Sequence, residues 1–150
     1  MKTILYALAA VFFISLQPAN AQLGREKGEA FIAENAKKEG VKTLPSGLQY
    51  KVIKDGTGKM PTKENSVLAH YKGTLIDGTE FDSSYKRGKP LEIPVTGVIK
   101  GWTEALQLMK EGAKWQLFIP WQLAYGDRSK GPLIGPYETL VFEIELVKVL

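Results

Sequence analysis

One short stretch, residues 95–109, limits the fold more than any other part of the sequence, because after residue 47 it alone is patterned as a helix. Its large apolar residues recur at spacings of three and four, which would place them on one helix face: Ile99, Trp102, Leu106 and Met109. Gly112 follows as the stop signal expected just past a helix end. The pattern predicts a sheet with a single short helix packed across one face.

The start of this helix carries an unusual pair, a glycine directly before a large aromatic residue. Because Gly101 has no side chain, another backbone or a ligand could come close to the indole of Trp102. Helical spacing by itself favours an ordinary core position for Trp102. Whether the indole also serves a binding site depends on the residues that the sheet brings to it.

The segments around the helix alternate between apolar and polar residues, as half-buried strands do. Five segments show this pattern: 48–54, 66–75, 91–95, 114–119 and 139–149. Asp77-Gly78 predicts a hairpin turn that leads from the second of them into residues 80–84. Residues 121–136 form a long connection whose large apolar residues are typical of a functional loop rather than a disordered one. We interpret Trp121, at its start, as a residue of a pocket rim.

The first 21 residues predict a signal peptide rather than part of the fold. Lys2 supplies a positive charge, residues 4–16 are an apolar run, and Ala19-Asn20-Ala21 has the small-x-small pattern of a cleavage site. The apolar run is shorter than the roughly 20 residues that span a membrane, which favours cleavage over anchoring. We therefore expect an exported chain that begins at Gln22, is not attached to a membrane, and resides in the periplasm, with the cell surface and the medium as alternatives.

Residues 22–46 predict a charged helix and a linker in front of the main domain, which we place at residues 47–150. Within residues 24–40 the helix former is rich in charge and alanine, and only Phe31 and Ile32 are large and apolar. Such a helix is either a solvent-exposed arm or half of an association surface. Residues 43–47 are rich in turn formers and end the helix.

The composition excludes several classes of function. The sequence has no cysteine, which removes disulfides, thiol catalysis and thiolate metal sites. His70 is the only histidine and has no carboxylates at metal-ligand spacing, so neither a metal nor another cofactor is expected. After signal cleavage the net charge would be about +3, with basic and acidic residues interleaved. This pattern predicts a solvated surface and no nucleic-acid binding.

Covalent catalysis is also disfavoured by the local patterns. A serine triad would need Ser83 or Ser84 with His70, but no nucleophile elbow is present, and alternation turns His70 away from the face of Tyr71. The carboxylates are spaced as surface residues, against glycoside hydrolysis. Gly56-x-Gly58 is followed by no helix, which argues against a phosphate loop.

A pocket made largely of aromatic side chains remains. It would combine Tyr71, Phe81, Val98, Ile99, Trp102, Tyr125, Leu133 and Phe142 with the carboxylate of Asp82. Such a pocket suits a compact apolar group and contains no nucleophile. Plain core packing is the alternative, although Tyr125 stands in a loop beside a glycine, which argues against a purely structural role.

Five separated motifs in this region resemble the FKBP-type peptidyl-prolyl cis–trans isomerases. The motifs are Tyr71-Lys72-Gly73, Phe81-Asp82-Ser83-Ser84, Val98-Ile99-Lys100-Gly101-Trp102, Ala124-Tyr125-Gly126 and residues 140–146. Their order and spacing are similar to the family's over roughly residues 47–150. The segment before them is similar to the bacterial Mip-like branch, with a shortened N-terminal region.

The resemblance implies an α+β fold, in which a curved, mostly antiparallel sheet of five or six strands wraps around one short α-helix, plus an N-terminal helix. It implies proline-binding residues at Tyr71, Phe81, Asp82, Leu91, Val98, Ile99, Trp102, Tyr125, Leu133 and Phe142, of which Tyr71, Asp82, Trp102 and Tyr125 would be catalytic. Strict alternation would send Phe81 and Asp82 to opposite faces, so a bend or bulge is expected there. Lys130 occupies a loop-tip position that is often histidine in eukaryotic members, which changes the charge of the rim.

The resemblance also implies the partners. The expected activity is rotation of X–Pro bonds in exported, proline-containing polypeptides, with macrolides as candidate inhibitors. A chaperone or binding module that uses the same pocket with little turnover is the alternative. The chain is expected to be a monomer, or a weak dimer through its N-terminal helix.

Overall fold

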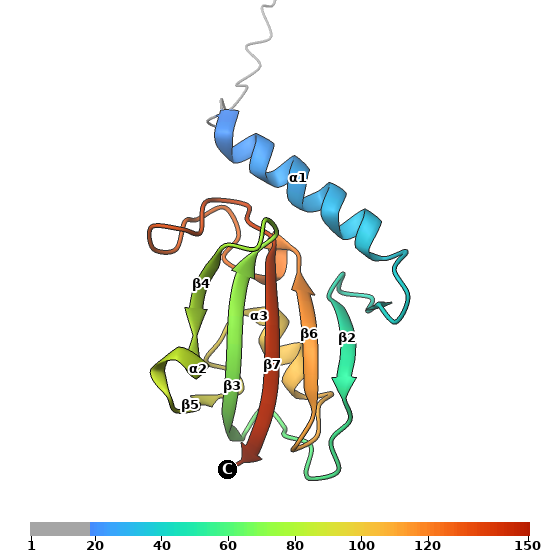
Figure 1. The fold of residues 1–150 in the computed structure, drawn as a ribbon, viewed down its shortest axis with the longest axis vertical. Helices are drawn as coiled ribbons and strands as arrows, with labels where there is room; N and C mark the ends of the chain where they lie inside the picture. Colours follow the sequence, from blue (N-terminus) through green and yellow to red (C-terminus); the bar gives the residue numbers. More distant parts are fainter. Residues whose placement is uncertain (1–18) are drawn as a thin grey trace, which may run out of the picture.

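The alternating segments form the strands of one antiparallel sheet in the computed structural model, which describes residues 19–150 (Figure 1). The strands are β1 (Lys42–Thr43), β2 (Gln49–Lys54), β3 (Ser66–Leu75), β4 (Glu80–Ser83), β5 (Leu91–Pro94), β6 (Lys114–Ile119) and β7 (Leu140–Val149). Their order is β1-β2-β6-β7-β3-β4, and β5 also pairs with β3. Six of them are longer than two residues, which confirms the expected α+β fold.

The last strand lies in the middle of the sheet. β7 pairs with β3 on one side, where Tyr71 faces Ile144, and with β6 on the other, where Leu117 faces Phe142. These apolar pairs follow from the alternation, which sends every second residue of β7 to the core side. The helix packs against this core side of the sheet. The buried side chains of β7 therefore help to hold the sheet and the helix together.

The helix across that face is α3 (Lys100–Leu106), which is shorter than the apolar spacing predicted. Met109 is fully buried, but it follows the helix in a turn in which its N–H donates to the Ala105 carbonyl. The prediction that Gly112 ends the helix is wrong, because α3 ends at Leu106 with Gln107 as its C-cap. Gly112 lies further on, at φ +89 in the turn before β6. The close neighbour of Gly101 is the side chain of Ile119, which a β-carbon there would meet at 2.7 Å, and not the backbone that the glycine led us to consider.

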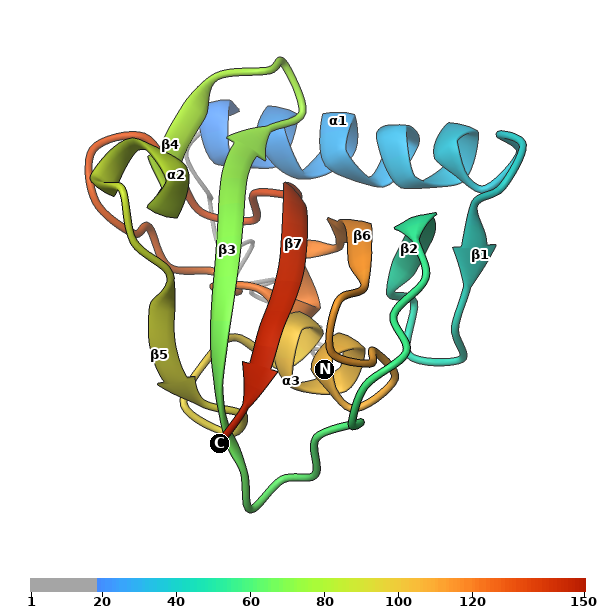
Figure 2. The ribbon, with the colours of Figure 1, turned by 60° about the horizontal axis from the view of Figure 1, so that its bottom comes forward.

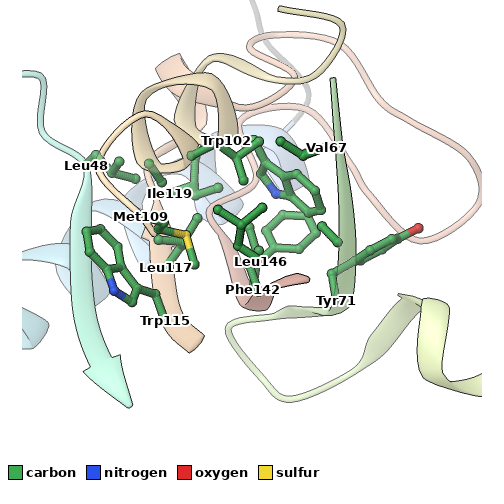
Figure 3. Close-up of a cluster of buried hydrophobic side chains, with 14 of the residues drawn as sticks. Leu48, Val67, Tyr71, Trp102, Met109, Trp115, Leu117, Ile119, Phe142 and Leu146 are labelled. Atoms are coloured by element: carbon green, nitrogen blue, oxygen red, sulfur yellow. The ribbon is translucent and has the colours of Figure 1, made fainter. Parts of the chain in front are cut away.

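The hydrophobic core fills the space between α3 and the sheet (Figure 3). Its buried members include Leu48, Val67, Trp102, Leu106, Met109, Trp115, Leu117, Ile119, Phe142 and Leu146. All eighteen buried residues of this cluster fall between Leu48 and Leu146, so the residues before Leu48 contribute none of them. Two further helical turns, α2 (Ser84–Arg87) and η1 (Trp121–Leu123), lie at the edges of the sheet.

The N-terminal helix α1 (Ala19–Asn35) lies across the end of the sheet, as Figures 1 and 2 show. It begins and ends about five residues earlier than the stretch we predicted, and its first turn contains the expected cleavage motif. Residues 1–18 of the predicted signal peptide lie outside the described part of the chain. Within residues 19–150, no helix is long and apolar enough to cross a membrane.

Helix α1 is docked against the domain rather than extended into solvent. Gly28 lies so close to the sheet that a β-carbon on it would be 2.4 Å from Thr139 Oγ1. The buried Asn35 amide donates to Gln49 Oε1 at 2.9 Å. Gln49 in turn donates to the carbonyl of Ile32. These contacts fasten both the middle and the end of α1 to the folded domain.

The segment that we interpreted as a linker belongs to the sheet. β1 pairs antiparallel with the start of β2, with Lys42 opposite Tyr50. The connection between them is closed by a hydrogen bond from the Leu44 N–H to the Leu48 carbonyl, at 2.8 Å. The turn formers at residues 44–47 therefore make a tight hairpin, and the sheet begins before residue 47.

Candidate active site

An open cavity of about 430 Å³ lies between the N-terminal end of α3 and the sheet. It is lined by Tyr71, Phe81, Asp82, Leu91, Gly97, Val98, Ile99, Trp102, Tyr125, Lys130 and Phe142. Nine of the ten residues proposed for substrate binding from the sequence thus meet in one place, although they come from four strands, one helix and two loops. Gly97 and Lys130 complete the lining.

The floor of the cavity is an aromatic cluster around Trp102. The indole packs edge to face against the rings of Tyr71 and Phe142, with centroids 5.1 and 5.3 Å away (Figure 3). Phe81 makes the same kind of contact with Phe142 at 5.5 Å. Trp102 is only 4% exposed, yet it lines the cavity, and its buried indole N–H has no hydrogen-bond partner within residues 19–150. The ring is therefore both a core residue and the floor of a binding site.

Gly73 makes room for two of these rings. A β-carbon there would meet Phe81 at 2.6 Å and Phe142 at 2.7 Å, closer than real β-carbons approach. Glycine in a central strand weakens the strand, so its presence marks a close approach. The positions of Phe81 and Phe142 in the cavity wall therefore depend on the absence of a side chain at Gly73. In the sequence, Gly73 stands out only as part of a motif.

A β-bulge brings two adjacent residues to the cavity. In the pairing of β3 with β4, Gly73 faces Asp82 while Thr74 faces Glu80. Phe81 is the extra residue of the bulge and has no partner in β3. The bulge lets both Phe81 and Asp82 line the cavity, as we expected from the conflict between alternation and the motif.

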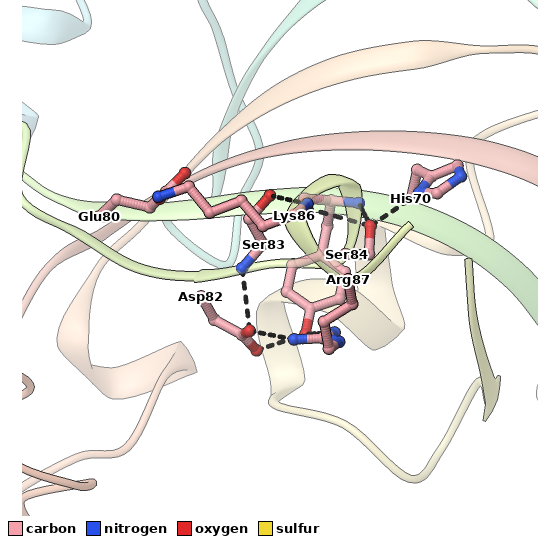
Figure 4. Close-up of polar contacts among 8 residues, drawn as sticks. His70, Glu80, Asp82, Ser83, Ser84, Lys86 and Arg87 are labelled. Carbon is pink, nitrogen blue, oxygen red and sulfur yellow. Dashed lines mark hydrogen bonds and ion pairs between the residues drawn. The ribbon is translucent and has the colours of Figure 1, made fainter. Parts of the chain in front are cut away.

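A polar network closes one side of the cavity around Asp82 (Figure 4). The Tyr71 hydroxyl and the Arg87 guanidinium both donate to the carboxylate of Asp82. Arg87 also donates to the Tyr71 oxygen at 2.8 Å, and the Ser83 N–H donates to Asp82 Oδ1 at 2.9 Å. The carboxylate therefore already accepts three hydrogen bonds before any ligand arrives.

The hydrogen bonds of this network, together with burial, set the protonation states of Asp82 and Tyr71. Burial alone would raise the pKa of the Asp82 carboxyl, but the hydrogen bonds from Tyr71 and Arg87 outweigh it and hold that pKa below its ordinary value. Burial, followed by the hydrogen bond to Asp82, raises the pKa of the Tyr71 phenol. At neutral pH Asp82 is an anion and Tyr71 a neutral donor, so neither is suited to proton transfer.

Sequence reasoning missed Arg87, which the short helix α2 positions. Ser83 caps this helix by accepting from the Lys86 N–H, and Gly88 ends it at φ +78. The buried hydroxyl of Ser84 accepts from the Tyr71 N–H at 2.7 Å and lies 2.8 Å from His70 Nδ1. A capping serine at position 83 with a glycine at 88 is the local signal that could have placed a turn of helix there.

The serine hydroxyls here are structural. Ser84 is fully buried, and its hydroxyl is held by the backbone of Tyr71 on β3. His70 is on the opposite face of β3 from the Tyr71 side chain and stacks on Tyr85 at 4.6 Å. Within residues 19–150, no aspartate side chain hydrogen-bonds to His70 or to Ser84. These contacts agree with the sequence argument against a serine triad.

Besides the indole N–H of Trp102, two hydrogen-bond donors at the cavity remain without a partner within the described residues 19–150. They are the hydroxyl of Tyr125 and the backbone N–H of Ile99, and both residues line the cavity. Burial, followed by the negative charge of Asp82, raises the pKa of the Tyr125 phenol, so it stays protonated at neutral pH. The cavity therefore offers two donors for carbonyl groups of a ligand.

Two residues lie elsewhere than the sequence suggested. Leu133 does not line the cavity and is 45% exposed, whereas its neighbour Ile134 is 5% exposed and packs into the core. Trp121 is not at this rim. Its indole donates to Glu29 of α1 and lies under the guanidinium of Arg25 and against the ring of Tyr137.

The fold and cavity together define a class. The cavity is a cup of aromatic rings with an anion already neutralised by arginine and two free donors. It contains no nucleophile, and within residues 19–150 no cluster of three His, Asp or Glu side chains could hold a metal ion. Such a cavity suits a compact apolar group flanked by carbonyls.

The chain belongs to the FKBP-type peptidyl-prolyl cis–trans isomerase family. The sequence model described by that name matches residues 57–147. A second model, described as the domain amino terminal to FKBP-type peptidyl-prolyl isomerase, matches residues 6–52. The resemblance read from five motifs is thereby confirmed.

Several characterised relatives are similar to the chain. It is 56% identical over 124 residues to the FKBP-type 22 kDa peptidyl-prolyl cis-trans isomerase of Escherichia coli K12, covering 83% of this chain and 60% of that protein. It is 55% identical over 129 residues to the outer membrane protein MIP of Legionella longbeachae, covering 86% and 55%. The chain thus spans little more than half the length of these relatives.

Two solved structures share the fold. The crystal structure of FkpA from Escherichia coli matches with a TM-score of 0.83 and 48% identity, over 87% of this chain and 61% of that one. A peptidyl-prolyl cis-trans isomerase from Pseudomonas syringae pv. tomato matches with a TM-score of 0.81 and 41% identity, over 89% and 98%. The sheet wrapped around α3 is therefore the family's fold.

Proposed function

We propose that this protein accelerates cis–trans isomerisation of X–Pro bonds in exported polypeptides. The observation that carries the proposal is the open aromatic cavity floored by Trp102, on whose lining the Tyr125 hydroxyl and the Ile99 N–H have no partner within residues 19–150. Its volume and apolar walls suit a proline ring. The donors suit the carbonyl groups on either side of the ring.

The mechanism needs no reactive side chain. Rotation about the imide must break amide resonance, with a barrier of about 18–20 kcal/mol, and takes tens to hundreds of seconds unaided. The twisted transition state has lost that resonance and is less charge-separated than the planar form. An apolar cavity that replaces water around the bond disfavours the planar form relative to the twisted one.

The lining residues take separate parts in this mechanism. Trp102 supports the proline ring from below, and the rings of Tyr71, Phe81 and Phe142 wall it. The Tyr125 hydroxyl and the Ile99 N–H hold the flanking carbonyls in a bent path that favours the twisted bond. Both groups are free to do so because neither is engaged by residues 19–150.

Asp82 acts by orienting Tyr71. Its oxygens already accept from Tyr71, Arg87 and the Ser83 N–H, which leaves little capacity to meet a substrate carbonyl carbon. This engagement favours orientation of the Tyr71 ring over direct contact between Asp82 and the polarised carbonyl of the substrate.

The proposed setting is an exported compartment, most simply the periplasm. The support is the charged start, apolar run and small-x-small motif of residues 1–21, together with the similarity to the outer membrane protein MIP of Legionella longbeachae. Processing is tested by expressing the full chain in a bacterium that has a periplasm and measuring the mass of the released protein. A chain beginning at Gln22 is expected, and an unprocessed cytoplasmic chain would contradict the proposal.

Isomerase activity is tested with short X–Pro peptides and with the refolding of a proline-limited protein. The matched pair of variants is Tyr125→Phe and Tyr85→Phe. The second removes a hydroxyl from the opposite side of the sheet, where it donates to Glu145. Tyr125→Phe is expected to lower kcat/KM by roughly two- to tenfold, since one neutral hydrogen bond contributes about 0.5–1.5 kcal/mol. Tyr85→Phe should leave it unchanged.

The same assay separates the enzyme from a binding module. The wild-type protein could bind proline peptides and suppress aggregation without accelerating peptide isomerisation or proline-limited refolding. That result would favour a chaperone or binding module over an isomerase. If Tyr125→Phe and Tyr85→Phe behave alike, the assigned role of Tyr125 is wrong. A macrolide that competes with the peptides would place inhibition at the same cavity, whereas non-competitive inhibition would place it elsewhere.

A further inference from the structure

One charge on the cavity lining has no ion-pair partner within the part of the chain that the structure describes. Two charged side chains line the cavity, Asp82 and Lys130. Asp82 is paired with Arg87, whereas Lys130 forms no ion pair with any residue from 19 to 150. Its ammonium lies 5.9 Å from the centroid of the Tyr125 ring, beside one of the two free donors. A bound polypeptide therefore meets an unpaired positive charge at this side of the cavity.

The loop that carries Lys130 is built to hold it there. The Lys130 N–H donates to the Ile134 carbonyl at 2.8 Å, and these two residues form an isolated β-bridge. Gly131 completes the turn at φ +63, a conformation that favours glycine. Ile134 is 5% exposed and anchors the base of the turn in the core. The backbone at Lys130 is thus fixed, although its side chain remains exposed and adaptable.

We propose that Lys130 is a specificity-determining residue that makes the site prefer substrates with an acidic side chain next to the proline. This inference rests on the proposed isomerase function and adds the substrate class. A carboxylate one residue before or after the proline ring in the cavity is within reach of a lysine side chain on the rim. The apolar lining lowers the local dielectric and strengthens the attraction relative to open water.

The preference has a defined kinetic signature. The carboxylate of the substrate keeps its charge throughout rotation, so Lys130 attracts the planar and the twisted forms equally. An interaction of that kind lowers KM and leaves kcat nearly unchanged. Because the side chain is exposed, the effect must also weaken as added salt screens it.

The experiment measures kcat and KM for three peptides that differ only in the residue before proline, which is Glu, Gln or Lys. A second set places the same residues directly after proline. The protein is tested as the wild type and as Lys130→Gln and Lys130→Glu. Arg128→Gln is the matched control, because it removes one positive charge from the same loop at a residue that does not line the cavity.

The wild type is expected to give a Glu-to-Gln ratio of kcat/KM of roughly two to five in at least one set, the range that an exposed ion pair supports. The ratio should arise in KM, fall toward one at high salt, become about one in Lys130→Gln, and drop below one in Lys130→Glu. Arg128→Gln should keep most of the wild-type ratio.

Three results would overturn the inference. A wild-type ratio of one in both sets, with the Gln peptides turned over normally, removes the preference and leaves the isomerase function standing. A ratio that falls as far in Arg128→Gln as in Lys130→Gln assigns it to the general charge of the loop. If no peptide is turned over, the proposed function fails, and equal affinities for Glu and Gln peptides in a binding titration then remove the preference as well.

Discussion

Asp82 shows how one residue of the cavity wall ties stability to pH. Its carboxylate accepts from Tyr71, from Arg87 and from its neighbour's N–H, and these hydrogen bonds are strongest while it is ionised. Its pKa is lowered despite burial, which means that folding favours the anion. By linkage, such a group contributes stability that is complete above the unfolded-state pKa and is lost as pH falls through the folded-state pKa.

We predict that Asp82→Asn destabilises the protein at pH 7 and hardly at all in strong acid. Hydrogen bonds to charged groups contribute about 1.5–3 kcal/mol, and solvent screening of this partly exposed side chain reduces the loss to about 1 kcal/mol. The free energies of urea unfolding of both proteins should converge as pH falls below the ordinary aspartate pKa. Asp127→Asn, which removes a carboxylate without a hydrogen bond or ion pair among residues 19–150, is the control. A pH-independent difference would show that the lost interaction is not ionic.

The site was largely predictable at the level of residues, because aromatic residues and glycines at motif spacing carry much of it. What the sequence could not supply was the direction of side chains in irregular segments. Between Leu133 and Ile134, either residue could have turned inward, and only the bridge at Lys130 decides that Ile134 does. Arg87 was missed because its role depends on the single turn of α2.

Among the elements, strands were predicted better than helices. Strict alternation marks β3 and β6 within a residue of their ends, because each strand has one buried face. The end of α3 was overestimated because Met109 keeps the apolar spacing in a turn where the chain has already left the helix. The position of α1 was missed for a different reason. Its contacts with the domain use Ala21, Gly28 and Asn35, which do not form an apolar stripe.

We predict that Gly28→Ala weakens the docking of α1. Alanine is a better helix former than glycine by about 1 kcal/mol, but its β-carbon would lie 2.4 Å from Thr139 Oγ1. Thr139 is itself buried, so relief of the clash must move the helix. Overpacking of this kind costs about 1–3 kcal/mol and outweighs the gain in propensity.

Gly24→Ala is the matched control, because nothing lies within 4 Å of a β-carbon there and only the gain in helix propensity remains. Urea unfolding followed by tryptophan fluorescence should therefore shift in opposite directions for the two variants. Adding Thr139→Ala to Gly28→Ala should restore most of the loss, since it removes the clashing hydroxyl, which has no hydrogen-bond partner within residues 19–150. Equal shifts for both glycine variants would refute the close contact.

At the scale of the whole molecule, α1 is attached to a domain that does not need it for its core. The buried cluster between α3 and the sheet takes no residue from α1, and neither does the cavity lining. The helix instead covers surface features, with Phe31 against Phe118 at a centroid distance of 6.1 Å and the Arg25–Glu29 pair against Trp121. Folding of the sheet and formation of the cavity should therefore be separable from the helix.

We predict that a chain starting at Val41 still folds cooperatively and keeps its activity on short proline peptides. Its stability should fall by roughly 1.5–3 kcal/mol, since Phe118, now 6% exposed, would lose its cover. The control is a chain starting at Ala19, which retains α1. Near-ultraviolet circular dichroism and urea unfolding would report the fold, and kcat/KM would report the cavity. Loss of the cooperative transition, or loss of kcat/KM in a chain that remains folded, would mean that α1 supports the active site itself, because the core and the lining would then be insufficient alone.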